Sequence, residues 1–324
     1  MELGLGRSGH PYQLSPFGVG LEETRGMWEE ALAILPRDWT EDVFCHRGKY
    51  DDIPPREVVP KPLQKPHPPL WGACNQEDTA YLTGKMGFGC LVITHRGAER
   101  AQKLISLYKD AISQAEPQGK FIHNHVAANT LAYCGEAREK ARARGAELLD
   151  WYRNMQRIRE ERNWQDIDLE DIPEDHRFHL QKGADARGGD NVTGRDLVAT
   201  HRFCMGDPED CIKFIAQFAA IGVEALMFNF QLGPVAQQEI GVAGSIVAGT
   251  IWRDLLEPHR GIGFRQQLTG NPSGIVDGRL QHLGKGQFAV PTLRFHKRVD
   301  GPRYRHRRQA RARNPLDAPP RQRF

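Results

Sequence analysis

The sequence predicts an α/β fold organised around a parallel sheet. Strand-like and helical segments alternate, with strands expected at 2–5, 70–74, 88–94, 123–133 and 223–230. This spacing leaves room for a helix between successive strands, which is the usual connection between parallel strands. A closed (β/α)8 barrel has eight strands. Five strands would therefore form only part of such a barrel.

The opening segment is expected to be a short strand that ends at an anion site. Residues 2–5 are partly apolar, and Gly4 and Gly6 allow a backbone or a ligand to approach closely. Arg7 follows directly, at the carboxyl end of this strand. Its position there makes it the first candidate for binding an anionic ligand.

The first helix is expected from about Thr24, which suits an N-cap, to Leu35, because apolar residues recur along one face. Arg25 lies at the head of this helix, one loop after Arg7. Because each guanidinium presents a planar fork of donors, two of them converging at one place suit a phosphate. The alternative, from the residues alone, is that both arginines form ordinary salt bridges.

A hairpin and a proline-rich crossing segment follow. Residues 43–59 indicate two short strands around Gly48, and seven prolines between 54 and 69 favour an extended chain. Helices are then expected at 76–86 and 98–114, each after one of the predicted strands.

A long helix and an irregular stretch are expected further along. The helix covers about 136–161, and residues 163–205 are polar with scattered glycines, which indicates an excursion over the ligand face. Asp207-Pro208 predicts the start of another helix, because proline is favoured in a first turn.

Charge is unevenly distributed. Residues 260–324 contain 15 Lys and Arg against 3 Asp and Glu, whereas the remainder contains 29 basic and 38 acidic residues. The sequence therefore predicts a barrel-like unit at 1–259 and a basic tail at 260–324. The tail is expected to be disordered or to be read out of frame from a GC-rich gene. A nucleic-acid-binding arm is the alternative, although we do not expect a nucleic-acid partner.

Cysteine usage and hydropathy favour a cytoplasmic protein. The six cysteines form no CxxC pair and do not match a zinc knuckle, so free thiols in a reducing compartment are expected. No basic-then-apolar leader is found. The longest apolar run, 240–251, is shorter than the roughly 20 residues that a membrane span needs, so no membrane partner is expected.

A second candidate phosphate contact lies at the turn from strand 70–74 into its helix. A helix N-terminus offers free N–H groups and the positive end of a dipole, and Asn75 is able to donate its side-chain amide there. Cys74 fits either a buried filler or a site residue. Asp78 would repel a phosphate, so it is expected to cap the helix or to face Arg25.

Taken in order, several motifs resemble the bacterial luciferase-like monooxygenase family. They are Glu2-Leu-Gly-Leu-Gly-Arg7, Phe17-Gly-Val19, Arg25 with segment 30–35, Gly48-Lys-Tyr50, and segments 59–64, 66–70, 80–89 and 206–223. The resemblance covers about residues 2–240 and implies a TIM-like (β/α)8 barrel. In that family the opening motif belongs around the fourth strand, so the resemblance implies that the first three β/α units are absent here.

The resemblance also implies an activity. It implies a flavin-dependent monooxygenase that uses reduced FMN and O2 to oxygenate a small organic substrate. A separate NAD(P)H-dependent flavin reductase would supply the reduced flavin. The cofactor-binding residues implied are Gly6, Arg7, Arg25, Cys74, Asn75 and Asp78.

Two alternatives stay open at this point. A deazaflavin-dependent oxidoreductase of the same superfamily shares much of this pattern. An inactive, truncated fragment of such an enzyme is the other reading, because a sheet without its first strands exposes unpaired edges. Association into a homo-oligomer is one way in which such a sheet could be completed.

His10 and Tyr12 are the candidate catalytic residues. They follow the first strand, and in a TIM barrel the loops at the carboxyl ends of the strands form the catalytic face. His10 suits an acid or base, with a solvent-exposed loop histidine as the alternative. His123 and His125 lie on one face of a predicted strand, as a metal pair would. No third ligand stands at a useful spacing, so no metal is expected.

Overall fold

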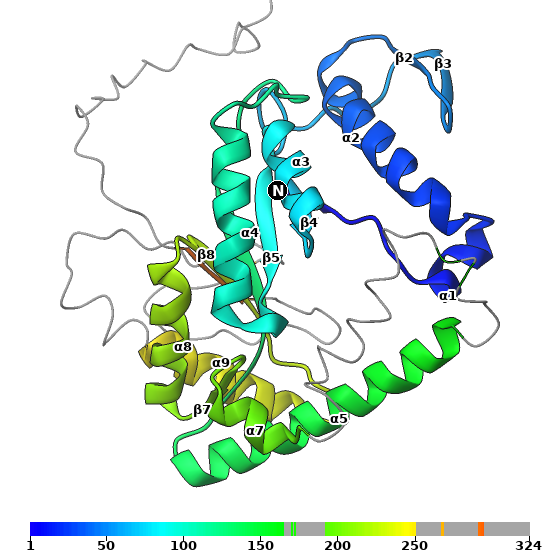
Figure 1. Cartoon of the computed structure of the whole chain (residues 1–324). Coiled ribbons are helices and arrows are strands. Elements are labelled where there is room, and N and C mark those ends of the chain that lie inside the picture. The colour runs from blue at the N-terminus through cyan, green and yellow to red at the C-terminus, as the bar shows by residue number, and fades with distance from the viewer. Residues whose placement is uncertain (165–169, 171, 173–191, 251–266, 269–290, 295–324) are drawn as a thin grey trace, which may run out of the picture.

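The computed structural model describes residues 1–164, 170, 172, 192–250, 267–268 and 291–294. Its main element is a curled, open sheet with the strand order β1-β4-β5-β6-β8-β10-β9, and β7 pairs with β6 (Figure 1). The five predicted strands are confirmed as parallel neighbours: β1 (Leu3–Leu5), β4 (Leu70–Cys74), β5 (Gly89–Ile93), β6 (Val126–Cys134) and β8 (Ala225–Asn229). The described strands thus form a half-barrel.

Helices connect these strands in the expected order. They are α1 (Pro11–Leu14), α2 (Thr24–Thr40), α3 (Glu77–Lys85), α4 (Gly97–Ile112), α5 (Arg138–Trp164), α7 (Gly194–Ala199), α8 (Pro208–Ala220) and α9 (Gln237–Thr250). The largest core cluster lies between the sheet and helices α4, α8 and α9. It includes Tyr108, Phe214 and Phe218, whose side chains are fully buried.

The first long helix extends further than its sequence pattern predicts. Thr24 is its first residue rather than its N-cap, and the Thr24 hydroxyl donates to the Leu21 carbonyl at 2.8 Å. The helix continues through Pro36 to Thr40. The predicted hairpin is confirmed as β2 (Phe44–Arg47) and β3 (Asp52–Arg56).

One carboxylate of α2 holds the β2–β3 turn in place. Glu30 accepts hydrogen bonds from the backbone N–H groups of Lys49, Tyr50 and Asp51 at 3.0–3.2 Å, and the His46 ring nitrogen lies 2.9 Å from it. Because these three backbone amides of the turn donate to a carboxylate on α2, the hairpin is held against that helix.

The stretch expected to be irregular holds two regular elements among its described residues. The Thr193 hydroxyl accepts a hydrogen bond from the Asp196 N–H and caps α7, and β7 (Cys204–Gly206) adds a short parallel strand beside β6. The rest of 163–205 falls largely outside the described residues. Six residues of the basic tail are described, as β9 (Gln267–Leu268) and β10 (Pro291–Arg294), and β10 pairs antiparallel with β8. For the remaining tail residues, disorder stays a prediction.

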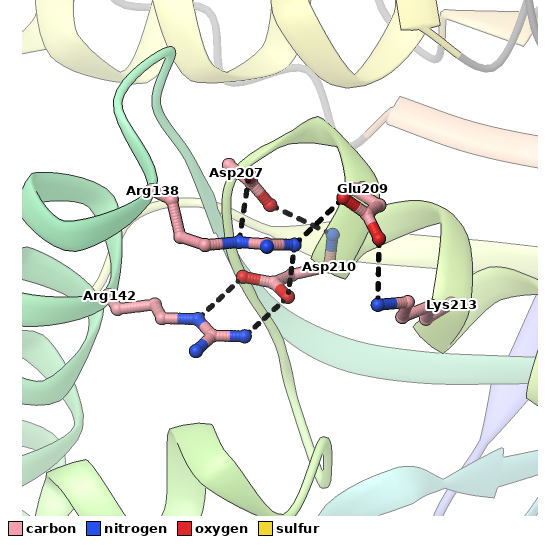
Figure 2. A network of polar contacts seen from close by, with 6 residues as sticks. All are labelled: Arg138, Arg142, Asp207, Glu209, Asp210 and Lys213. Carbon is pink, nitrogen blue, oxygen red and sulfur yellow. Dashed lines mark hydrogen bonds and ion pairs between the residues drawn. The ribbon is translucent and has the colours of Figure 1, made fainter.

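The start of α5 is bound to the start of α8 by an ion-pair network (Figure 2). Asp207 is the N-cap of α8 and accepts from the Asp210 backbone N–H at 3.0 Å. The Asp210 side chain is fully buried and accepts two hydrogen bonds from Arg142, at 2.7 and 2.8 Å. Arg138 lies 3.1 Å from Asp207 and 3.5 Å from Asp210. Because a buried carboxylate is tolerated only when it is paired, these contacts fix the amino-terminal part of α5.

Replacing Asp210 by Asn should destabilise the protein. The variant keeps the shape of the side chain but loses the charge that Arg142 faces, so we expect the free energy of unfolding to fall by about 1.5–3 kcal/mol in urea titrations. The matched control is Glu209→Gln on the same helix, whose side chain is 61% exposed. Its loss should stay within about 1 kcal/mol. Equal losses in the two variants would contradict the role assigned to the buried pair.

The stabilisation by Asp210 should depend on pH. Burial alone would raise the pKa of the Asp210 carboxyl, but the hydrogen bonds and charge of Arg142 hold that pKa at about 2. A carboxyl with a lowered folded-state pKa stabilises the fold fully above its unfolded value of about 4 and loses this contribution as it becomes protonated. The stability gap between the wild-type protein and Asp210→Asn should therefore be constant above about pH 5 and shrink between about pH 4 and 2. A gap that stays constant across this range would rule out the titration.

Candidate functional site

A cavity of about 420 Å³ lies where β1, β4 and β5 end. All of its lining residues belong to the described part of the chain. They come from the ends of these three strands and the segments that follow them, from α2, α3 and α4, and from the middle and far half of α5, which runs toward α1 (Figure 1). Phe203, just before β7, also lines the cavity. The volume is in the range typical of small-molecule and cofactor sites.

We call one side of this cavity the β1–α3 end. It is formed by the loop after β1, the first turns of α2 and the turn between β4 and α3. Its polar lining residues are Arg7, Ser8, His10, Arg25, Asn75 and Gln76. Gly6 lies at the start of this loop, and a Cβ there would meet only Ala73, at 3.8 Å.

Ser8 gives the β1 loop an unusual backbone. Its φ of +54° lies in the left-handed region, which is uncommon for residues other than glycine. The Ser8 hydroxyl donates to the Gln13 side chain at 2.9 Å and accepts from the His10 backbone N–H at 3.4 Å. These contacts hold a strained residue in the cavity wall, as is common at ligand sites.

Arg25 is held in place by two carboxylates. It donates to Asp78 at 2.7 Å and to Glu29 at 3.1 Å. Burial alone would raise the pKa of the Asp78 carboxyl, but the hydrogen bond and charge of Arg25, and the charge of Arg7, keep that pKa below its usual value. Asp78 therefore faces Arg25, as one of the two sequence-based alternatives predicted, and it is not among the residues that line the cavity.

We call the opposite side the α5 end. Its polar and aromatic lining comes from the segment after β5, from α4, from α5 and from the residue before β7. These residues are His95, Arg96, Arg100, Tyr152, Arg153, Gln156, Arg159 and Phe203. The His95 ring lies 5.9 Å from Tyr152, edge to face, and 5.3 Å from Phe203. Burial raises the pKa of Tyr152, so its phenol stays protonated at neutral pH.

The electrostatics of the lining are one-sided. Six arginines and two histidines line the cavity, whereas none of the described lining residues is Asp or Glu. The carboxylates that contact Arg25, Arg100 and Arg153 lie outside the lining. Glu77 accepts from Arg100 at 2.5 Å, and Asp150 lies 3.5 Å from Arg153. The cavity is therefore suited to an anionic ligand.

Several buried polar atoms in the lining are also available to a ligand. Trp28 Nε1, Gln76 Nε2, Arg100 Nε and Gln156 Oε1 have no hydrogen-bond partner within the described residues. A buried donor without a partner is costly, and most such groups in native proteins are satisfied by water or by a ligand.

The structure brings five of the predicted site residues together. Gly6, Arg7, His10, Arg25 and Asn75 all line the cavity. The other three lie outside the lining, and one of them is Asp78, which faces Arg25. The Cys74 thiol is fully buried and donates to the Gly72 carbonyl at 3.3 Å, and Tyr12 is 65% exposed on α1, outside the lining.

The two histidines considered for a metal precede β6 instead of lying on it. The His125 ring lies 2.6 Å from Glu224, and the two histidine rings are 4.8 Å apart. Among the described residues, no group of three or more His, Cys, Asp or Glu side chains is arranged to hold a metal ion.

Sequence reasoning missed the α5 end altogether. Leu149, Tyr152, Gln156 and Arg159 recur every three or four residues, which places them on one face of a helix. That periodicity was readable in the sequence, but nothing in it pointed this face toward the strand ends.

No helix within the described residues has the length and apolar character required to span a bilayer.

Comparisons with known proteins agree with the fold and define the family. The family model described as luciferase-like monooxygenase matches residues 1–225. Among curated proteins, the uncharacterized protein y4vJ of Sinorhizobium fredii is 31% identical over 125 residues, covering 38% of this chain and 35% of that protein. The oxygenase component of the flavin-dependent trigonelline monooxygenase of Acinetobacter baylyi is 23% identical over 114 residues, covering 34% of this chain and 31% of that protein. The match thus spans about a third of the length of these relatives.

Solved structures share the fold at low sequence identity. The monooxygenase RslO1 from Streptomyces bottropensis superposes with a TM-score of 0.57 and 19% identity, covering 79% of this chain and 69% of that one. An F420-dependent secondary alcohol dehydrogenase in complex with an F420-acetone adduct gives a TM-score of 0.51 and 14% identity, covering 77% and 69%. Since the family model covers well over half of the 324 residues, the chain belongs to the luciferase-like monooxygenase family.

Proposed function

We propose that the protein is a flavin-dependent monooxygenase that uses reduced FMN and O2 to oxygenate a small organic substrate. Family membership supports an oxidoreductase of this kind. The observation that carries the proposal is the cavity at the carboxyl ends of the strands, with its six arginines and no carboxylate among the described lining residues. In barrels of this type the catalytic face lies at that edge of the sheet.

The β1–α3 end suits the phosphate of the flavin. Arg7 and Arg25 supply two guanidiniums there, and Asn75 a side-chain amide. No side chain of Gln76 caps the N-terminus of α3. The Thr79 N–H donates to the Asp78 carboxylate at 2.7 Å, so the amides of Glu77 and Asp78 and the helix dipole are what this end offers to an anion. The buried Trp28 Nε1 and Gln76 Nε2, which have no partner within the described residues, add two donors. The residues present therefore fit such a ligand.

The roles of the protein's own groups follow from this placement. Arg7 and Arg25 bind and orient the cofactor's phosphate, and the apolar lining residues Leu104 and Leu149 keep water from the interior. His10 also lines this cavity, and we propose it as the group that holds or moves a proton at the substrate. When bound, reduced flavin supplies the electrons for O2 activation, which is chemistry that the side chains lack. One oxygen atom goes to the substrate and the other leaves as water.

We propose a separate NAD(P)H-dependent flavin reductase as the partner that delivers reduced FMN. The similarity to an oxygenase component of a flavin-dependent monooxygenase supports a two-component arrangement. A deazaflavin-dependent oxidoreductase is the second candidate, because the cavity holds more arginines than one phosphate requires.

Losing either phosphate-binding arginine should weaken FMN binding. A charge-assisted hydrogen bond contributes about 1.5–3 kcal/mol, so Arg7→Ala and Arg25→Ala should each raise the Kd for FMN more than tenfold in fluorescence titrations. The control is Arg47→Ala, whose side chain is 89% exposed on the β2–β3 hairpin, and it should leave the Kd unchanged.

The same titration separates the alternatives. Unchanged affinity in both cavity variants would show that the phosphate lies elsewhere. Tight binding of F420 with no binding of FMN by the wild-type protein would favour the deazaflavin reading. Failure of the folded protein to bind either compound would favour the alternative that the chain is an inactive fragment of such an enzyme.

A further inference from the structure

We propose that Asp78 is a positioning residue, which holds the Arg25 guanidinium in place at the β1–α3 end for an anionic ligand that Asp78 itself does not touch. The inference deepens the proposed function, on which it rests, by adding a residue that acts through Arg25. Asp78 places a negative charge next to a site for an anion, so its charge alone would disfavour binding. Its contacts argue for the opposite role.

Asp78 joins the two helices whose first turns form the β1–α3 end. It lies in the first turn of α3, and Arg25 is the second residue of α2. One Asp78 carboxylate oxygen accepts from Arg25 Nη1 at 2.7 Å, and the other accepts from the Thr79 backbone N–H at 2.7 Å. Because the contact with Thr79 fixes the carboxylate on its own helix, the contact with Arg25 fixes the guanidinium relative to α3.

The two partners of this ion pair stand in different places relative to the cavity. Arg25 lines it, whereas Asp78 does not. Their side chains are 36% and 39% exposed, so the pair by itself contributes little to the stability of the fold. Burial alone would lower the pKa of Arg25, but the hydrogen bonds and charges of Asp78 and Glu29 raise that pKa. Arg25 is thus charged and held from outside the lining, which lowers the ordering cost when an anion binds.

Glu29 contacts Arg25 in a different way. It lies four residues further along α2 and accepts from Arg25 Nε at 3.1 Å. A contact with this spacing restrains a side chain along its own helix, but it does not relate Arg25 to α3. Of the two carboxylates, Asp78 alone ties Arg25 to the helix on the other side of the site.

The experiment compares FMN with riboflavin, which lacks the phosphate, in fluorescence titrations of the full chain. Asp78→Asn removes the charge and keeps the size of the side chain. We expect it to lower the preference for FMN over riboflavin about threefold to tenfold, the cost of ordering one long side chain on binding. Asp78→Glu keeps the charge and should restore part of the preference. If Asp78 acted only through its charge, Asp78→Asn would raise the preference instead.

Glu41→Gln is the matched control. Glu41 accepts from Arg37 at 2.7 Å at the end of α2, with side chains 34% and 42% exposed, and neither residue lines the cavity. The variant changes net charge equally and should leave the preference unchanged. In an Arg25→Ala background, Asp78→Asn should cause no further loss, because the two residues act through one contact. Circular dichroism of each variant separates a lost contact from a lost fold.

A second measurement follows Arg25 without any flavin. Phenylglyoxal modifies accessible guanidinium groups, and mass spectrometry of the digested protein gives the rate at each arginine. Asp78→Asn should raise the rate at Arg25 several-fold, because the guanidinium is then no longer held. Arg47, which is 89% exposed on the β2–β3 hairpin, should react at the same rate in both proteins. Glu41→Gln should change neither rate.

The outcomes separate this inference from the proposed function. A wild-type protein that does not prefer FMN, or a preference that survives Arg25→Ala, would contradict the phosphate site. Faster modification of Arg25 in Asp78→Asn would then still support the role of Asp78 in holding Arg25. An FMN preference that is lost in Arg25→Ala but unchanged or raised in Asp78→Asn would overturn that role, as would an unchanged modification rate at Arg25.

Discussion

The buried contact between Asp210 and Arg142 is the constraint on which the cavity depends. It fixes the amino-terminal part of α5 to α8, and Leu148 and Leu149 then pack the middle of the helix into a core cluster with Phe203 and Leu197. A helix held at both places carries its distal half toward the strand ends. Because truncating one partner of a buried ion pair leaves an uncompensated charge, the geometry of the α5 end is tied to a contact that lies outside the cavity (Figure 2).

Six arginines line the cavity, so several positive charges lie close together. Guanidiniums that share a small volume repel one another, and the repulsion is offset by carboxylates placed outside the lining. Asp78 and Glu29 hold Arg25, Glu77 holds Arg100 and Asp150 lies beside Arg153. Several of these acids are partly exposed, so each contact contributes modestly to stability. Their main effect is to orient the arginines before a ligand arrives, which lowers the ordering cost of binding.

The fold and one end of the site were predictable from the sequence, and the other end was not. Strands such as 70–74 stood out because short apolar runs alternated with helices, and Arg7 and Asn75 followed because a residue after a strand lies at a known edge of the sheet. Tyr12 was expected beside His10, but it lies on the short helix α1 with its side chain exposed to solvent. β7 has three residues, which are too few to show the alternation of side chains that marks a strand. The α5 end depends on which way a long polar helix points, and that is decided by tertiary contacts at Asp210. The absence of three β/α units stays a prediction.

The two ends of the cavity are held mainly by different contacts, although Glu77 at the start of α3 links them through Arg100. The β1–α3 end is built from loops of adjacent parallel strands, whose register is fixed by backbone hydrogen bonds between β1 and β4. The part of the α5 end that lies on α5 is fixed by side-chain contacts with α8 and β7. Backbone pairing tolerates side-chain change, whereas side-chain contacts do not. On the proposed function, binding of the flavin phosphate therefore depends on the sheet, whereas substitutions on α5 are expected to change the rest of the cavity without disturbing the sheet.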